Sequence, residues 1–539
     1  MKNSSDFEFD DLQGLIRFAY VNYGKLTDTC FMLLNIVNAT AAKKWLSTAP
    51  VTSAVLSESP PDKALQIAFS AQGLHALGLN KAVIKDFSDE FIIGMSGDES
   101  RSRRLGDVDI NAPEYWLWGG DAKQVPHVLL LLYAELGNIE AWREKVEGKH
   151  FLKAFKVVTT LPTENIGQIE PFGFTDGISQ PRIDWSRQQS TDMHERDRYS
   201  NLLAIGEVVL GYPNEYKQYT LRPLIDPEKD KLAAVLPNAE DEPALKDFGR
   251  NGSYLVLRQL GQDVPGFWQF VDKAACSVPE KREQLAASMV GRYRDGSPLV
   301  PEVVKDIPGI ASDDHLNHFN YNEDPRGNQC PIGAHIRRAN PRTGDLPSGV
   351  TGRVTRLIKI LGFGGNCQEQ DLAGSSCFHR LVCWLIKILG IEQNRRDEDL
   401  VASSRFHRLL RRGRSYGPKL APEDAIKPDA PAAERGLQFI CLVANISRQF
   451  EFVQNAWSMS SKFSGVQHER DPLLGHRKPL MGGEVTDQFN RPNPSGPVQK
   501  TCALPQFITV RGGGYFFMPG LRALKYLATL PTKGSDISS

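Results

Sequence analysis

The sequence lacks an excess of charge of either sign. Among its 539 residues, Lys and Arg total 64, and Asp and Glu also total 64, so the formal net charge is zero. A protein whose main partner is nucleic acid or an anionic membrane usually has a basic surplus, because both partners attract cations. The sequence therefore predicts neither nucleic acid nor a membrane as a partner.

Long apolar runs and metal-type cysteine pairs are also absent. Runs such as VLLLLYA at 128–134 are far short of the roughly 20 residues that cross a bilayer. The opening MKNSSDFEFDDLQG carries four acidic residues and no apolar core, unlike a secretory signal. The eight cysteines show no CxxC spacing, which disfavours zinc and is typical of reduced thiols. We therefore expect a cytoplasmic protein.

Strand-like and helix-like segments alternate in both halves of the chain. The apolar runs at 30–37 and 126–135 each precede a helical pattern, and the runs at 252–260 and 436–445 do the same. About 41% of the residues are hydrophobic, which is typical of globular proteins. The pattern predicts an α+β protein of two similar units, each an antiparallel sheet with helices on one face.

The expected domain boundaries follow from a polar stretch between these halves. We predict an N-terminal domain at 1–190, a polar connecting segment at 191–250 and a C-terminal domain at 251–539. The C-terminal part contains an internal duplication, in which LIKILGFGGNCQEQDLAGSSCFHRL (357–381) recurs as LIKILGIEQNRRDEDLVASSRFHRL (385–409) with about 15 of 25 positions identical. Two copies are too few for a solenoid, so a tandem duplication within one domain is the simpler interpretation.

The stretch GFTDGISQPR (173–182) places Asp176 in a glycine-flanked loop. Glycines permit positive φ and leave space beside the carboxylate. From this loop alone, Asp176 is either an Asp that caps a turn or a carboxylate that a reactant must approach.

The stretch CPIGAHIRRANPR (330–342) places His335 before a basic run of Arg337, Arg338 and Arg342. A neutral imidazole can be an axial ligand of haem iron, and guanidinium groups can pair with haem propionates. The alternative is a histidine with ordinary hydrogen bonds beside a basic surface loop.

The stretch RFHRLLRRGRSYGP (405–418) is also strongly basic. An arginine over haem can stabilise the charge that develops as a peroxide O–O bond breaks. The alternative is a solvated helix end, since basic residues suit a helix C-terminus before a glycine.

Together these stretches resemble the dye-decolourising (DyP-type) peroxidases. PFGFTDGISQP is similar to the family's Gly-x-x-Asp-Gly motif, CPIGAHIRRANPR to its proximal-histidine segment and LLRRGRSYGP to its distal-arginine segment. The likeness extends from about residue 10 to residue 528.

The resemblance implies two ferredoxin-like domains with antiparallel sheets and packed helices, related to the dimeric α+β barrel. Haem b (iron protoporphyrin IX) would be held mainly by the C-terminal domain, with His335 as the iron ligand and Arg337 and Arg411 among the cofactor-binding residues. Asp176 would be the distal acid/base and Arg411 the distal arginine. Hydrogen peroxide would be reduced to water while small aromatic or dye-like reductants lose electrons singly, with greatest activity at mildly acidic pH.

The resemblance leaves several questions open. If the first duplicated copy took the place of the second in the fold, Cys383 would stand in place of Arg411. The unbroken stretch RFHRLLRRGRSYGP favours the second copy as the one that supplies the distal arginine. Asn445 stands where we associate the family with an Asp that orients the proximal histidine, and an amide there would make His335 a weaker electron donor. Tyr416 and Trp457 are candidates for relaying electrons, with core packing as the alternative role. The oligomeric state is undetermined, and a homo-oligomer is compatible with the sequence.

Two other functions compete with the peroxidase. One is a haem-binding protein for storage, transfer or sensing, with a distal pocket impaired by the duplication. The other is a haem-free structural α+β protein.

Overall fold

The computed structural model describes residues 7–20, 25–57, 61–121, 124–187, 201–300, 316–317, 319–321, 324–342 and 403–531. The first copy of the duplication (357–381) lies outside these residues, and so does most of the second. The segment that carries Arg411 lies within them.

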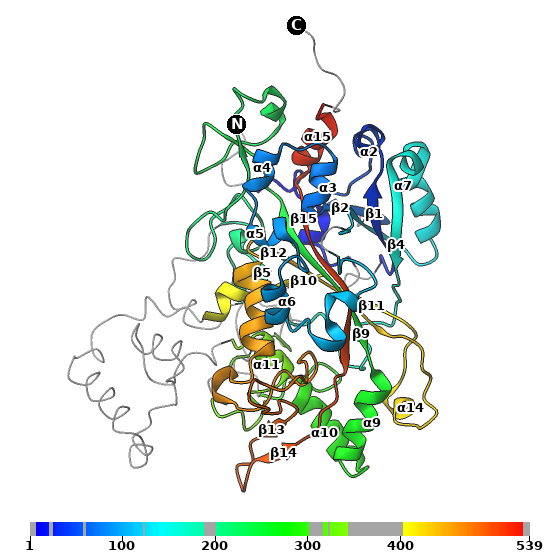
Figure 1. The fold of residues 1–539 in the computed structure, drawn as a ribbon, viewed down its shortest axis with the longest axis vertical. Coiled ribbons are helices and arrows are strands. Elements are labelled where there is room, and N and C mark those ends of the chain that lie inside the picture. The colour runs from blue at the N-terminus through cyan, green and yellow to red at the C-terminus, as the bar shows by residue number, and fades with distance from the viewer. Residues whose placement is uncertain are drawn as a thin grey trace, which may run out of the picture.

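One antiparallel sheet of nine strands runs through the described chain (Figure 1). Its order is β10-β12-β9-β15-β2-β3-β1-β4, and β11 also pairs with β12. The strands are β1 (Asp28–Ile36), β2 (Lys63–Phe69), β3 (Val128–Ala134), β4 (Phe155–Leu161), β9 (Ser253–Gln262), β10 (Leu410–Arg411), β11 (Arg414–Tyr416), β12 (Gly436–Val443) and β15 (Ile508–Met518). Short two-stranded pairs lie outside this sheet: β5 (Arg182–Ile183) with β6 (Leu202–Leu203), β7 (Leu224–Ile225) with β8 (Lys246–Asp247), and β13 (Phe489–Arg491) with β14 (Gln499–Thr501).

The two halves of the sheet share one strand order. In the N-terminal half the order is β2-β3-β1-β4, so the first strand, β1, lies between the third and the fourth strands in the chain. The C-terminal half has the same order, β10-β12-β9-β15, if β10 and β11 are counted as one interrupted strand. The halves join where Phe517 of β15 pairs with Phe69 of β2. The predicted α+β fold of two ferredoxin-like units is confirmed. Among the described residues, however, the sheet stays open, with β10 and β4 at its edges, and does not close into a barrel.

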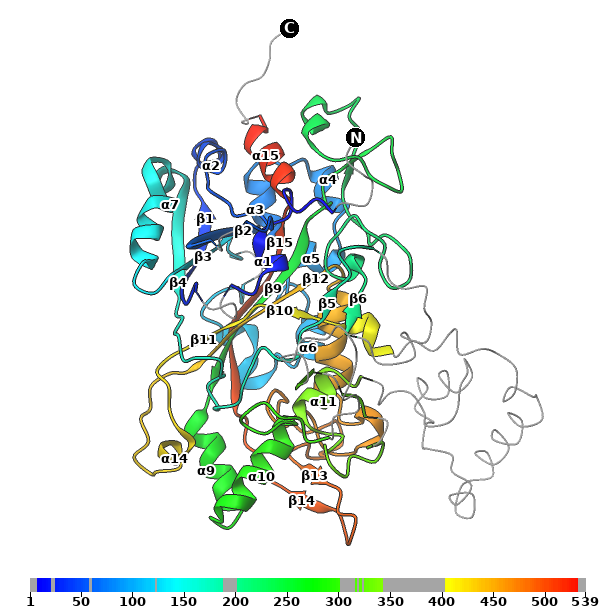
Figure 2. The same cartoon turned by 180° about the vertical axis from the view of Figure 1, so that it is seen from behind.

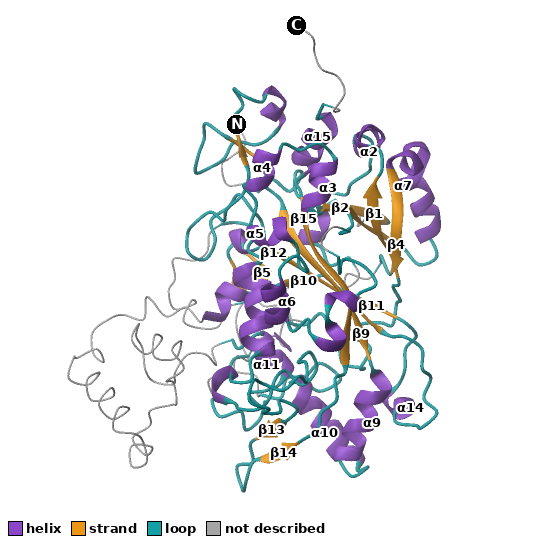
Figure 3. Ribbon diagram, viewed as in Figure 1, coloured by secondary structure: helices purple, strands orange, loops and turns teal. Residues whose placement is uncertain are grey.

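Helices cover one face of this sheet, with α2, α7 and α15 near β1–β4 and α9, α10 and α11 at the opposite end of the molecule (Figures 1 and 2). The helices are α1 (Gly14–Arg17), α2 (Ala39–Leu46), α3 (Ala71–Ala76), α4 (Lys81–Lys85), α5 (Asp89–Ile93), α6 (Glu99–Leu105), α7 (Ile139–Ala154), α9 (Val264–Ala274), α10 (Pro279–Val290), α11 (His335–Ala339), α14 (Pro422–Ala425) and α15 (Leu521–Thr529). Loops make up much of the end around α11 (Figure 3). No helix in the described part of the chain combines the length and apolarity needed to span a membrane.

The predicted strands and helices are confirmed, with one difference in helix type. After β12 the chain forms π-helical turns at Ser447–Glu451 and Val453–Met459 instead of a regular α-helix. A π-helical turn is frequent at functional sites because it re-aims side chains within a helix. Phe450 and Val453, on these turns, face the cavity described below.

The polar connecting segment is more buried than its composition suggests. Its apolar residues Leu203, Ile205, Val208, Val209 and Tyr212 pack against the second face of the sheet, together with residues of the N-terminal arm. The polar composition of this segment predicts a connection with excursions over the surface. That prediction is wrong for 203–212, because a short apolar cluster inside the polar stretch packs on the second face of the sheet. The boundaries 1–190, 191–250 and 251–539 stay a prediction.

Candidate active site

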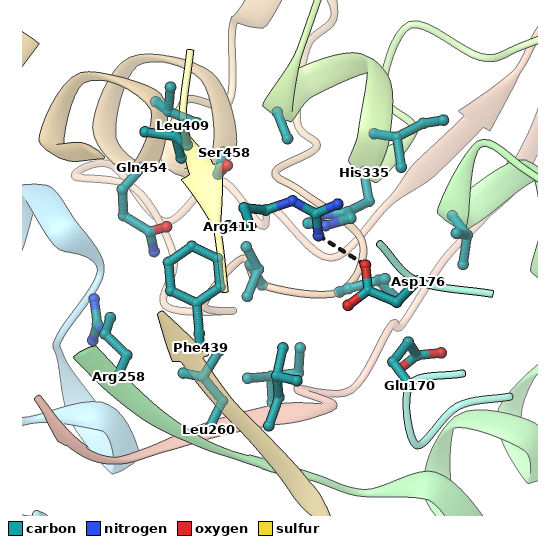
Figure 4. Close-up of a pocket in the computed structure, with 18 of the residues that line it drawn as sticks. Glu170, Asp176, Arg258, Leu260, His335, Leu409, Arg411, Phe439, Gln454 and Ser458 are labelled. Carbon is teal, nitrogen blue, oxygen red and sulfur yellow. Dashed lines mark hydrogen bonds and ion pairs between the residues drawn. The ribbon is translucent and has the colours of Figure 1, made fainter. Parts of the chain in front are cut away.

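A cavity of about 250 Å³ lies between β9, β12 and β15 and the helices at the C-terminal end. Most of its wall is apolar, including Phe172, Phe174, Ile178, Leu260, Val290, Ile336, Leu409, Leu437, Phe439, Phe450, Leu473 and Ile508. Asp176, His335 and Arg411 all line it, and their side chains converge on one part of it (Figure 4). The structure thus brings together residues that are far apart in the sequence: 159 positions separate Asp176 from His335, and 76 separate His335 from Arg411.

The loop that carries Asp176 is folded around the carboxylate of Glu170. Glu170 accepts hydrogen bonds from the backbone N–H groups of Phe172 (3.0 Å) and Phe174 (3.1 Å), and from Nε2 of Gln262 on β9 (2.9 Å). Burial raises the pKa of Glu170 to about 7 despite these bonds. The chain then turns at Gly173 and Gly177, whose φ angles of 96° and 87° favour glycine. The predicted use of glycine in this loop is confirmed.

Asp176 forms a turn bond, as one of the two sequence alternatives predicts, and also an ion pair with Arg411. Its Oδ1 accepts the backbone N–H of Gly177 (2.6 Å), which is a turn bond, and also Nη1 of Arg411 (2.8 Å). Burial alone would raise the pKa of Asp176, but the charge and hydrogen bond of Arg411 and the Gly177 bond outweigh it. The pKa of this carboxyl is therefore lowered, and Asp176 stays ionised into mildly acidic pH.

The position of Arg411 on a strand explains why it, and not Arg412, meets Asp176. Successive side chains of a strand point to opposite faces. Arg411 turns to the cavity, whereas Arg412 donates to the carbonyls of Leu15 (2.8 Å) and Ile16 (3.2 Å) on the far side.

His335 is held by a buried carboxylate. It opens α11, and its Nδ1 lies 2.8 Å from Oδ2 of Asp471, which is fully buried. Oδ1 of Asp471 accepts the backbone N–H groups of Leu473 and Leu474, both at 2.9 Å. Because an ionised carboxylate only accepts, the imidazole donates from Nδ1 and, when neutral, keeps Nε2 free of a proton. Burial lowers the pKa of His335, but Asp471 outweighs burial and raises it overall.

This geometry corrects the expectation for Asn445. Its Oδ1 accepts the backbone N–H of Arg448 (2.8 Å), so it caps the turn after β12 and does not orient His335. Asp471 has that position instead, and the inference of a weakly held histidine is wrong. The sequence around Asp471, HERDPLLG, contains no motif that singled it out.

Arg337 does not line the cavity, contrary to its expected place among the cofactor-binding residues. Its guanidinium donates to Asp324 (3.0 Å) and to the carbonyl of Cys330 (2.6 Å), and lies over the ring of Tyr321. The side chain is buried, and its charge is neutralised by Asp324. A helix residue two positions after His335 points to a different side of α11, which explains the difference.

Four arginines besides Arg411 line the cavity: Arg258, Arg292, Arg342 and Arg408. Arg292 donates to carbonyls of Gly296 and Leu316 and to Oγ of Ser179, and it has no carboxylate partner among the described residues. Arg342 lies near it, and burial together with Arg342 lowers the pKa of Arg292 to about 10. Such a pair of buried cations favours an anionic ligand.

A second cavity, of about 70 Å³, meets the first at the Asp176–Arg411 pair. Both cavities share Asp176, Arg411, Leu437 and Phe439 as lining residues. Exposed residues at 167–168 and Gly413 border the smaller one. The ion pair is therefore reachable from a side other than that of His335.

The two aromatic residues considered for electron relay are both in the interior. Tyr416 is 2% exposed and donates to the carbonyl of Leu260, and Trp457 is 8% exposed. The described positions match the core-packing alternative and not a surface site.

Fold and site together define a class: an α+β protein with a carboxylate-held imidazole and an acid–arginine pair facing one mainly apolar cavity. No family model matches the chain. The chain is 26% identical over 517 residues to the dye-decolorizing peroxidase msp1 of Mycetinis scorodonius, covering 92% of this chain and 80% of that one. It is also 26% identical to the multifunctional dye peroxidase DyP2 of an Amycolatopsis species, covering 86% and 82%.

The fold is shared with solved structures. A fungal DyP-type peroxidase from Auricularia auricula-judae superposes with a TM-score of 0.66 at 21% identity, over 97% of this chain and all of that one. The chain is similar in sequence to dye-decolorizing peroxidases over most of its length and shares the fold of DyP-type peroxidases, which supports an oxidoreductase of the peroxidase class. A haem-binding protein without catalysis is not favoured, because the relatives are peroxidases and the Asp176–Arg411 pair is intact.

Proposed function

We propose that this chain uses haem b to reduce hydrogen peroxide, with His335 as the iron ligand, Asp176 as the acid/base and Arg411 as the charge-stabilising group. The observation that carries the proposal is the arrangement of these three side chains around one cavity. Small aromatic reductants are the proposed electron donors, since a related dye-decolorizing peroxidase has been solved in complex with 2,6-dimethoxyphenol.

The residues present suit a haem. The Nδ1–Asp471 bond leaves Nε2 of His335 available as a ligand atom, which is the usual arrangement for a metal-binding histidine. The apolar wall suits the porphyrin faces. Arg292 and Arg342, and not Arg337, are the arginines that we propose for the propionates, because they face the cavity and Arg292 has no carboxylate partner among the described residues.

Bound haem would supply the iron at which the peroxide O–O bond is cleaved. Asp176, ionised because Arg411 lowers its pKa, takes the proton from one peroxide oxygen. It then returns this proton to the other oxygen, which leaves as water. Arg411 donates hydrogen bonds to the negative charge on the departing oxygen, a contribution of about 2.7–4 kcal/mol per donor in other enzymes.

The lowered pKa of Asp176 also fits the expected activity at mildly acidic pH. Burial alone would raise the pKa of this carboxyl, whereas the pairing with Arg411 lowers it and keeps Asp176 a base at mildly acidic pH. The second cavity is the proposed route by which peroxide approaches, since it is lined by Asp176 and not by His335. A cytoplasmic location stays a prediction that rests on the cysteine pattern.

The test is a haem titration of the purified protein. We expect a Soret band that saturates at one haem per chain and is lost in His335→Ala. The exposed His75→Ala is the matched control and should keep the band. A full-strength, stoichiometric Soret band in His335→Ala would contradict the assignment of the iron ligand.

A further inference from the structure

Within the part of the chain that the structure describes, β10 is an edge strand, and the backbone of Arg411 has no neighbouring strand on one side. Its described strand partner is β12, where Arg411 is opposite Cys441. The backbone N–H of the next residue, Arg412, bonds to Ile440 of β12. Because these groups alternate along a strand, the N–H and C=O of Arg411 point away from β12. An unpaired edge of this kind needs another partner.

Gln180 is a partner of both groups, and the carbonyl also accepts Nη1 of Arg412 (2.9 Å). Its Oε1 accepts the backbone N–H of Arg411 (3.0 Å), and its Nε2 donates to the backbone carbonyl of the same residue (3.1 Å). One side-chain amide thus reproduces the pair of hydrogen bonds that an adjacent strand would make. The two bonds fix both the distance and the direction of Arg411 relative to the loop.

The backbone of Gln180 is itself anchored. Its carbonyl accepts Nδ2 of Asn201 (2.8 Å) and Nδ2 of Asn317 (3.1 Å). Gln180 follows Asp176 by four residues on the same loop, and the intervening Ser179 contacts both Arg292 and Arg411. Gln180 therefore connects the loop to the edge strand: its side chain bonds to the backbone of Arg411, and its own backbone is held by Asn201 and Asn317.

We propose that Gln180 is a positioning residue that sets the separation of the Asp176 carboxylate and the Arg411 guanidinium. The inference rests on the proposed roles of these two groups. Asp176 is fixed to the loop by the bond to Gly177, and Arg411 extends from the strand. Without Gln180 the strand loses both of its backbone hydrogen bonds to the loop, so the ion pair loosens and Asp176 becomes a stronger proton acceptor.

The first test uses Gln180→Met, which keeps the length of the side chain and removes both hydrogen bonds. The probe is the pKa of Asp176, measured by ¹³C NMR in haem-free protein labelled at the Asp carboxyl carbon and assigned with Asp176→Asn. We expect a rise of about one pKa unit, a tenfold change in proton affinity. In the haem-loaded variant, the acid limb of the rate of reaction with peroxide should move by the same amount, with the KM for the reductant and the haem stoichiometry unchanged.

The control is Gln284→Met, an exposed glutamine on α10. The proposal would be overturned if the pKa of Asp176 in Gln180→Met lay within about 0.2 of its value in both the parent and this control, a difference of roughly 1.6-fold in proton affinity. A second measurement does not need the variant to fold. The Arg411 amide of the parent should be protected from hydrogen exchange although it faces away from β12, and an unprotected amide would equally overturn it.

Failure of this inference can be told apart from failure of the proposed function. If Asp176→Asn leaves the reaction with peroxide unchanged, the proposed role of Asp176 is wrong. If Asp176→Asn slows that reaction but Gln180→Met leaves the pKa of Asp176 unchanged, only the positioning role is wrong.

Discussion

Replacing Asp471 by asparagine tests how the protein holds the proposed iron ligand. The side chain is fully buried, and its Oδ1 is fixed by the N–H groups of Leu473 and Leu474. In Asp471→Asn, the amide oxygen takes over these two bonds, because only oxygen can accept them. The amide nitrogen then lies toward Nδ1 of His335, where two N–H donors would face each other.

The imidazole relieves this conflict by changing tautomer. Nδ1 loses its proton and accepts from the amide, so the proton moves to Nε2, the nitrogen that would bind iron. Haem binding must then reverse this change and break the new hydrogen bond. Loss of such a supporting carboxylate costs about 10–100-fold in metal affinity, or about 1.4–2.8 kcal/mol.

The assay is a haem titration followed by Soret absorbance at neutral pH, with Asn445→Asp as the control. Asn445 caps the turn at Arg448, so its replacement should leave haem affinity within about twofold, or roughly 0.4 kcal/mol. Equal haem affinity in Asp471→Asn and the parent would refute the reasoning. A tenfold change in Asn445→Asp with none in Asp471→Asn would return the supporting role to the residue that the sequence suggested.

Three further predictions concern the other side of the cavity. Asp176→Asn should slow the reaction with peroxide by about 10²–10⁴-fold in stopped-flow measurements while haem stays bound, because the amide cannot accept the proton; an unchanged rate would exclude Asp176 as the base. In Arg411→Leu the burial that raises the pKa of Asp176 is no longer opposed by a cation, so the acid limb of the pH–rate profile should move to higher pH, and a limb that moves to lower pH would contradict this. For Glu170, whose pKa of about 7 exceeds its unfolded value of 4.5, the folded state binds the proton more tightly. Its contribution therefore favours folding as pH falls from about 7 towards 4.5, with an upper limit of about 3 kcal/mol. Urea unfolding of haem-free Glu170→Gln should show a smaller loss of stability between pH 5 and pH 8 than the parent, and an equal loss would rule out this role.

The sequence was informative where one short stretch contains the whole signal. Apolar runs such as 126–135 predicted β3, and the glycines around Asp176 predicted a loop with positive φ. Arg411 was named from the resemblance alone, and the alternation of side chains along β10 is the physical reason that it, and not Arg412, meets Asp176. The wrong interpretations concern the direction of a side chain or its long-range partner. Arg337 lies in a basic run, but nothing in that run shows that Asp324 neutralises it.

The supporting residues of the site were out of reach for a different reason. Asp471 is 136 residues from His335, and Gln180 is 231 residues from Arg411, so each pairing exists only after the fold has brought distant parts of the chain together. Neither partner belongs to a type that is unusual at its position, since Asp is a common turn residue and a polar Gln is ordinary in a loop. The proposed reacting groups could be named because their types are chemically distinctive, whereas the groups that hold them are ordinary polar residues whose importance comes from the fold. Variants of the supporting residues, such as Asp471 and Gln180, are therefore the sharper test of the structure. Haem binding and peroxidase activity alone would not distinguish the arrangement described here from another that uses the same three reactive side chains.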